Sequence, residues 1–277
     1  MLMLDIIKVF IMGIVEGITE WLPISSTGHL ILVEEFISMD FRPEFWNIFV
    51  YVIQLGAILA VVWIYFDRLN PFSSQKSAEE KKQTWETWFK VVVGCIPAGV
   101  IGLLFNDFAE KHFQNWVVVS AALIIYGIAF IVVENRNKTR PVTVHSTQDL
   151  SYKKAFQIGL FQALSVIPGT SRSGSSILGA TILGTSRPTA ADFSFFMSIP
   201  IMFGMTFLKL TKGFLDGFRF STEEGFLLIL GMVIAYIVSI LTIRFLLRYV
   251  QKNDFKAFGW YRIALGIIVI IFFAIFQ

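Results

Sequence analysis

Charged residues are scarce in this sequence. They make up 16% of its 277 residues, against roughly 25% in a typical soluble domain. Hydrophobic residues make up 55%, including 29 Phe, and the mean hydropathy is +0.68. So apolar a chain excludes an ordinary soluble domain and indicates an integral membrane protein. The net charge of +3 says little by itself, and we expect no nucleic-acid partner.

The sequence has a single cysteine, and it lacks the features of a cleaved leader. The single thiol, Cys95, excludes an internal disulfide and a cysteine-rich metal site. Its neighbours in 92–97 are apolar, which predicts a buried, unreactive side chain. Residues 1–15 have neither a basic n-region nor an A-x-A-like cleavage site, so we expect no removable signal peptide.

Long apolar runs are abundant. A transmembrane helix needs about 20 mostly apolar residues. Six segments meet or approach that length: about 45–66, 88–105, 116–134, 190–210, 226–245 and 258–276. They predict an all-α polytopic membrane protein with six transmembrane helices, built as one integral membrane domain over residues 1–277.

Two further apolar segments, about 6–37 and 153–185, are interrupted near their middle by Pro, Gly and Ser. Irregular backbone at membrane depth is tolerated only where it is buried in protein or lines a water-filled cavity. We therefore predict two re-entrant helix-turn-helix segments in addition to the six spans.

The two interrupted segments are copies of one another. Residues 8–32 align with 154–178 at a constant offset of 146 (154 − 8), with seven identities, and Glu16 pairs with Gln162. Repeat 1 covers about 1–137 and repeat 2 about 150–277. Three spans separate the copies, so the copies enter from opposite faces and form an inverted repeat. Such folds place the binding site near the bilayer midplane. Copies that are similar in sequence but different in chemistry suggest the two halves of one site.

Basic residues predict the orientation. Of the 23 Lys and Arg residues, fourteen lie in one set of loops and helix ends and six in the other, while Lys90, Arg172 and Arg262 belong to neither set. The richer side is cytoplasmic. Both termini and the loops near 38–44, 106–115 and 211–224 then face outward.

The first break carries the reactive groups. Glu16 and Glu20 are four residues apart and share a helix face, and ionisable groups at membrane depth suggest a functional site. They could be satisfied by structural hydrogen bonds or bind Mg²⁺ or Ca²⁺, which prefer carboxylate and phosphate oxygens. Ser26 is the candidate nucleophile, with His29 or Glu20 accepting its proton; direct attack by water is the alternative. His29 could also serve only in helix packing.

The second break resembles an oxyanion site. Arg172 offers a planar fork of donors suited to phosphate, and a helix N-terminus follows it. The alternative is that small residues merely let helices pack closely. The expected phosphate-binding residues of both breaks are Ser25, Thr27, Ser171, Arg172, Ser173, Gly174 and Ser176.

These motifs resemble those of the bacterial undecaprenyl-diphosphate phosphatase family, the bacitracin-resistance proteins. The likeness rests on EGITEWLPISSTGH at 16–29 and PGTSRSGSS at 168–176, with VIQLGAILA at 52–60 and DFSFF at 192–196. It implies hydrolysis of undecaprenyl diphosphate to undecaprenyl phosphate in the bacterial cell membrane, which recycles the lipid carrier for peptidoglycan synthesis. It also implies a divalent cation, a site open to the outer face, a homodimer, and bacitracin competing indirectly by binding the substrate.

By match to the family, Glu16 and Glu20 are its acidic pair, Ser26 and His29 fall in its serine-histidine turn, and Arg172 is its phosphate-binding arginine. The rival function is a polyprenyl-phosphate flippase or an anion transporter, because inverted repeats with broken helices are typical of transporters. A transporter needs no nucleophile and base beside its anion site, whereas a phosphatase does.

Overall fold

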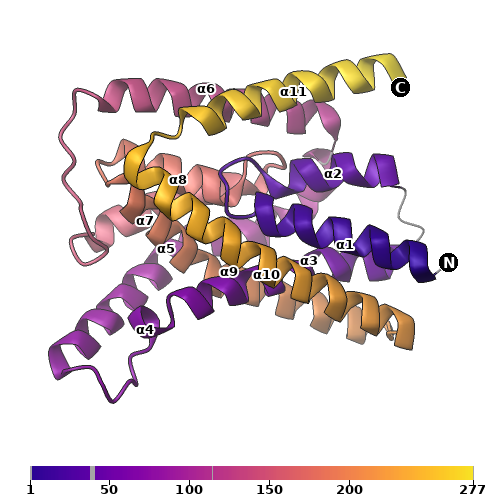
Figure 1. Ribbon diagram of the computed structural model, residues 1–277, viewed down its shortest axis with the longest axis horizontal. Coiled ribbons are helices and arrows are strands. Elements are labelled where there is room, and N and C mark those ends of the chain that lie inside the picture. Colours follow the sequence, from indigo (N-terminus) through magenta and orange to yellow (C-terminus); the bar gives the residue numbers. More distant parts are fainter. Residues whose placement is uncertain (1, 38–40, 114, 277) are drawn as a thin grey trace.

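The computed structural model describes residues 2–37, 41–113 and 115–276. Within these ranges the regular structure is helical, and the one β-type contact is an isolated bridge between Val144 and Thr185. The helices form a bundle and run in roughly the same direction or its reverse (Figure 1). The N-terminal and C-terminal helices both end on the same side of the molecule.

Within the described residues, six helices are long and apolar enough to span a membrane, which confirms the predicted class and number of spans. They are α3 (Pro43–Ile64), α5 (Ala78–Phe113), α6 (Trp116–Asn137), α9 (Arg187–Leu215), α10 (Thr222–Lys252) and α11 (Lys256–Phe276). A short helix, α4 (Phe66–Leu69), lies between α3 and α5. Large apolar side chains cover their outer surfaces; Leu103 of α5, for example, is 73% exposed. Such a surface fits lipid rather than water.

Both interrupted segments form helix pairs. In the first, α1 (Leu2–Thr19) and α2 (Ser26–Ile37) pack against each other across the break at 20–25. In the second, α7 (Tyr152–Ala163) and the 3-10 turn η1 (Leu164–Val166) precede the break, and α8 (Arg172–Ile182) packs back on α7. Proline in the first break and glycine with proline in the second end the helices where the sequence predicts. Entry of the pairs from opposite membrane faces stays a prediction.

The two halves are interleaved. Helix α1 of the first half packs on α10 of the second, and α7 of the second packs on α5 of the first. Gly13 and Gly159, equivalent by the 146-residue offset, lie at these crossings: an added Cβ would meet Ile234 or the carbonyl oxygen of Gly94. Helices α6 and α11 close the bundle along one side (Figure 1). Both breaks are thereby enclosed by helices from the two halves.

Candidate active site

The two breaks meet inside the bundle. The Ser173 hydroxyl of α8 donates to the backbone carbonyl oxygen of Glu20 at 3.0 Å, and the Arg172 guanidinium contacts the Glu20 carboxylate. Glu20, Ser173 and Ser26 are all buried. The two breaks that carry the predicted site residues are therefore in direct contact.

The helix after each break begins with the same local structure, a serine that has a positive φ and caps the helix. Ser25 and Ser171, equivalent by the 146-residue offset, have φ values of 75° and 71°, and they are the non-glycine residues with positive φ in the described chain. Each side-chain oxygen caps its helix by accepting from a backbone N–H three residues on, from Gly28 at 3.3 Å and from Gly174 at 3.0 Å. Non-glycine residues in this region are strained and cluster at functional sites.

This serine cap is followed by a different side chain in each of the two breaks. Ser26 is the first residue of α2 and Arg172 the first residue of α8, so each follows its strained cap directly. Both reach the same carboxylate. Ser26 Oγ donates to Glu20 Oε2 at 2.6 Å, while Arg172 Nη2 and Nε donate to Glu20 Oε1 at 2.6 and 3.3 Å. Glu20 thus orients the serine hydroxyl and is placed to accept its proton.

Glu16 lies in a different environment although it shares the helix face of Glu20. It is fully buried, and neither carboxylate oxygen has a hydrogen-bond partner among the described residues. The same holds for both side-chain atoms of Gln162, its equivalent in the second half. Burying polar atoms without partners is costly, so these orphan oxygens are suited to a bound cation or its hydration shell.

His29 contacts other groups than Ser26. Its Nδ1 lies 2.7 Å from the carbonyl oxygen of Ser25, and its Nε2 lies 2.7 Å from the Tyr261 hydroxyl. The two rings also stack, with centroids 5.6 Å apart. Of the two predicted proton acceptors for Ser26, the structure brings Glu20 to the hydroxyl and holds His29 against α11.

Some of the predicted phosphate-binding residues line a cavity, and others have hydrogen bonds elsewhere. Arg172 and Ser171 line a cavity of about 140 Å³, whereas the Ser173 hydroxyl is engaged with the Glu20 backbone. Ser176 is fully buried and lies 2.6 Å from Ser194 of α9, so the structure does not bring its hydroxyl to this cavity. At Gly174 an added Cβ would meet Ser171 and Arg262, so the glycine leaves room for these side chains.

Ser25 serves as the cap described above, and its side chain is buried. The side chain of Thr27 lies outside the part of the chain that the structure describes.

Helices α3 and α9 complete the small cavity. They contribute Tyr51, Gln54, Met202 and Met205, beside Glu20 and Ser26 from the first break. Gln54, which belongs to the VIQLGAILA motif at 52–60, lines the cavity. Its size suits a phosphate group rather than a whole lipid, since pockets for drug-sized ligands are larger, about 300–1,000 Å³.

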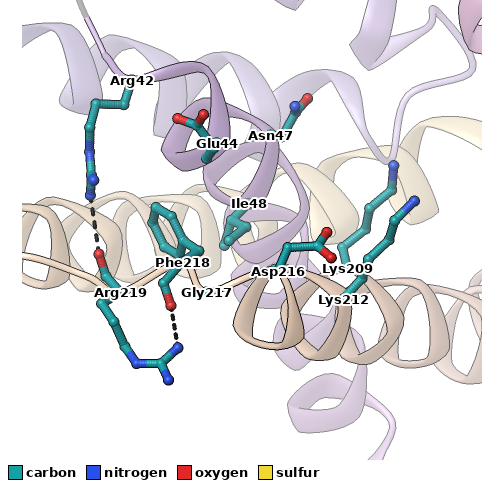
Figure 2. A pocket seen from close by; sticks show the side chains of 11 residues that line it. Arg42, Glu44, Asn47, Ile48, Lys209, Lys212, Asp216, Gly217, Phe218 and Arg219 are labelled. Atoms are coloured by element: carbon teal, nitrogen blue, oxygen red, sulfur yellow. Dashed lines mark hydrogen bonds between the residues drawn. The ribbon is translucent and has the colours of Figure 1, made fainter.

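A wider basic pocket lies about one helical turn further along the same two helices. Its volume is about 790 Å³, and its lining includes Arg42, Asn47, Lys209 and Lys212 (Figure 2). Asn47 precedes Tyr51 by four residues and Lys209 follows Met205 by four, so the two cavities share the α3 and α9 walls. The Lys209 ammonium lies 4.9 Å from the Tyr51 ring centroid. We call this the outer pocket.

One wall of the outer pocket is held by an ion pair. Arg42 donates to both carboxylate oxygens of Glu224 at 2.9 and 2.6 Å. It also donates to the carbonyl oxygen of Arg219 (Figure 2). Its hydrogen bond to Glu224 raises the pKa of Arg42 above its ordinary value. The lining of the outer pocket carries four basic side chains, Arg42, Lys209, Lys212 and Arg219, against the two acidic side chains Glu44 and Asp216.

Sequence reasoning missed three residues around the site: Tyr51, Tyr261 and Arg262. Tyr51 is three residues before Gln54, hence on the same helix face. Arg262 is the one charged residue within the predicted span 258–276, and an ionisable residue inside a span is a signal of function. Tyr261 has no comparable signal, because aromatic residues are frequent throughout this chain.

Known proteins resemble this chain over nearly its full length. A family model described as "Bacitracin resistance protein BacA" matches residues 9–268. The undecaprenyl-diphosphatase of Enterococcus faecalis is 56% identical over 270 residues, covering 98% of this chain and 98% of its own. Those of Lactiplantibacillus plantarum and Acetivibrio thermocellus are 55% and 52% identical, covering 99% and 98% of both chains respectively.

The strained caps predict an unusual order of stabilities. Ser171→Ala keeps the positive φ and removes the acceptor for the Gly174 N–H, which should lower the free energy of unfolding by about 1–2 kcal/mol. Ser171→Gly loses the same acceptor but relieves a backbone strain of about 1–2 kcal/mol, so it should stay close to the parent protein. Unfolding in detergent by a denaturant titration measures both, and Ser25 should behave alike.

Ser186 provides the matched control, since it caps α9 with an ordinary φ of −60°. Glycine at 186 has no strain to relieve, so it should not raise stability above the parent. Equal losses for glycine and alanine at 171 would contradict the strain argument.

Proposed function

The chain belongs to the bacitracin resistance protein BacA family, and from this membership and the geometry of the site we propose that it hydrolyses undecaprenyl diphosphate to undecaprenyl phosphate and inorganic phosphate. This reaction recycles the lipid carrier for cell-wall synthesis. The observation that carries the proposal is one buried carboxylate, Glu20, hydrogen-bonded to both a serine hydroxyl and an arginine fork. A nucleophile (Ser26) and a phosphate ligand (Arg172) thus both contact the same proton acceptor (Glu20).

The geometry supports a two-step phosphoryl transfer. Arg172 binds oxygens of the terminal phosphate, and Ser26 Oγ attacks its phosphorus while Glu20 accepts the hydroxyl proton. The bond from phosphorus to the bridging oxygen breaks, and undecaprenyl phosphate leaves with the electron pair. Water then cleaves the phosphoserine to release inorganic phosphate. Phosphoryl transfer depends mainly on positioning and charge stabilisation, which this arrangement supplies.

A divalent cation fits the residues present. Among the described residues no cluster of three or more His, Cys, Asp or Glu forms a closed metal site. Mg²⁺, however, is commonly held by one or two carboxylates together with substrate phosphates and water. Glu16 supplies two buried oxygens without partners, and Glu20 is the second expected ligand. When bound, the cation would neutralise charge on the diphosphate; Mg²⁺ and Ca²⁺ are both candidates.

The outer pocket supports a site that opens to the outer face of the bacterial cell membrane. It contains parts of 42–48 and 209–219, which the basic-residue asymmetry assigns to the outside. In this arrangement the two helix pairs enter from opposite faces, and the prenyl tail stays in the bilayer beside the lipid-facing helices. Substrate sequestration by bacitracin and a homodimer are further expectations from the family resemblance.

Flippase or anion-transporter activity is the rival function. The short contact between Ser26 and Glu20 favours hydrolysis, since transport requires no activated hydroxyl next to the arginine. Release of inorganic phosphate from undecaprenyl diphosphate by the purified, reconstituted protein tests the proposal directly. Lipid movement without phosphate release would establish the rival.

Turnover of two variants should separate the roles within the site. Ser26→Ala removes the attacking oxygen and should lower kcat by roughly 1,000-fold or more. Arg172→Lys keeps the charge but loses the planar fork, so kcat/KM should fall by roughly 100-fold. Phosphate release under single-turnover conditions measures both. Near-normal turnover by Ser26→Ala would show that water attacks the phosphorus directly.

Removing the orphan carboxylate should weaken the response to cation. Glu16→Gln keeps the shape but loses the charge, so the half-saturating Mg²⁺ concentration should rise at least roughly tenfold. Chelated protein titrated separately with Mg²⁺ and Ca²⁺ provides the measurement. Glu79→Gln, at the exposed start of α5, is the control and should titrate like the parent. An unchanged titration for Glu16→Gln would remove Glu16 from the cation site.

Orientation is testable by labelling. In a Cys95→Ala background, a cysteine replacing exposed Asp216 should react with a membrane-impermeant maleimide added to intact cells. A cysteine replacing exposed Gln75 should react only after the cells are opened. Labelling of both positions in intact cells would rule out the inverted arrangement.

A further inference from the structure

Arg262 of α11 lies buried at the junction of the two breaks. Its exposed fraction is 0%, and within the described chain its hydrogen bonds go to backbone carbonyl oxygens rather than to a carboxylate. A buried charge without a counter-ion is expensive. An apolar side chain could not donate these hydrogen bonds, so the burial of the guanidinium indicates a role that depends on them.

Its acceptors identify that role. Arg262 Nη1 donates to the carbonyl oxygen of Pro23 at 3.2 Å, and Nη2 donates to that of Gly169 at 2.8 Å. Pro23 and Gly169 are equivalent by the 146-residue offset, so one guanidinium joins the same point of both breaks. Nη2 also donates to the carbonyl oxygen of Thr170 at 3.0 Å.

The other contacts tie the guanidinium to the scaffold. Nε and a further Nη2 contact reach the carbonyl oxygens of Leu123 and Ala122 in α6, each at 3.4 Å. The Tyr126 ring lies 5.4 Å from the guanidinium carbon. The two breaks are thus fixed to each other and to the packed pair of α6 and α11.

The joined carbonyls lie close before the reactive residues in the sequence. Pro23 stands three residues before Ser26, and Gly169 three before Arg172. A shift of one break relative to the other would separate Arg172 from Glu20, where the contact is 2.6 Å long, and so from the Ser26 hydroxyl that Glu20 also binds. Displacements of about 1 Å at reacting groups can cost about 100-fold in rate.

We propose that Arg262 is a positioning residue, which holds the two breaks in register so that Ser26 and Arg172 act on one phosphate. The inference rests on the proposed phosphatase function. The test is a double-mutant cycle, which detects residues that act as a unit. Arg262→Gln keeps two N–H donors but loses the positive charge and the planar guanidinium that reaches both breaks. Arg262→Lys keeps the positive charge but also loses the planar guanidinium.

In the parent protein Ser26→Ala should cause the large loss of kcat predicted above. With Arg262→Gln or Arg262→Lys already present, kcat should be at least tenfold lower than in the parent, and adding Ser26→Ala should reduce it by a much smaller factor. Arg187→Gln is the control, because Arg187 pairs with Glu134 away from the site. It should leave the full Ser26→Ala factor intact even if it lowers the unfolding midpoint.

The outcomes are separable. Absence of phosphate release by the parent protein would defeat the proposed function itself. Release by the parent, with the full Ser26→Ala factor retained in the Arg262 variants, would overturn the positioning role. Loss of folded protein in both Arg262 variants, judged by gel filtration in detergent, would equally overturn it and make Arg262 a purely structural residue.

Discussion

The structure depends on one constraint: two interruptions of helical backbone lie inside an apolar bundle, where water does not satisfy their polar groups. The interruptions satisfy each other instead. Ser173 of the second donates to the backbone of Glu20 in the first, serine side chains cap the helices that follow, and Arg262 donates to carbonyls of both. The interleaved packing of α1 on α10 and α7 on α5 brings the breaks close enough for these contacts.

Sequence patterns predicted most of the architecture because the deciding quantities are local. Length and hydropathy define the spans, and Pro23 with its serine-rich neighbours defines the first break. The 146-residue offset predicted that two copies share one site, although an offset shows equivalence and not distance. The role of Arg262 was not predictable, because its acceptors are backbone carbonyl oxygens from three separate segments. Every residue has a backbone carbonyl, so the sequence does not indicate which of them an arginine contacts.

The two carboxylates show what helical spacing leaves undetermined. Glu16 and Glu20 share a helix face, yet Glu20 has protein partners on both oxygens and Glu16 has none in the described chain. The difference arises because Glu20 is at the end of α1, where the other break reaches it, while Glu16 is one turn inside the helix. An unsatisfied buried carboxylate is destabilising. Its retention is understandable if a cation with the substrate completes its contacts, whereas Glu20 serves the proton transfer.

The equivalence of Ser26 and Arg172 explains why a symmetric backbone carries an asymmetric site. The same strained turn aims both side chains at one point. Two arginines there would place two charges beside a single carboxylate at membrane depth, where each unpaired one costs about 3 kcal/mol or more. Two serines would leave the phosphate without a charged ligand. One of each, joined by Glu20, provides a nucleophile and an anion ligand at nearly neutral total charge. The repeat supplies the geometry, and the divergence of its copies supplies the chemistry.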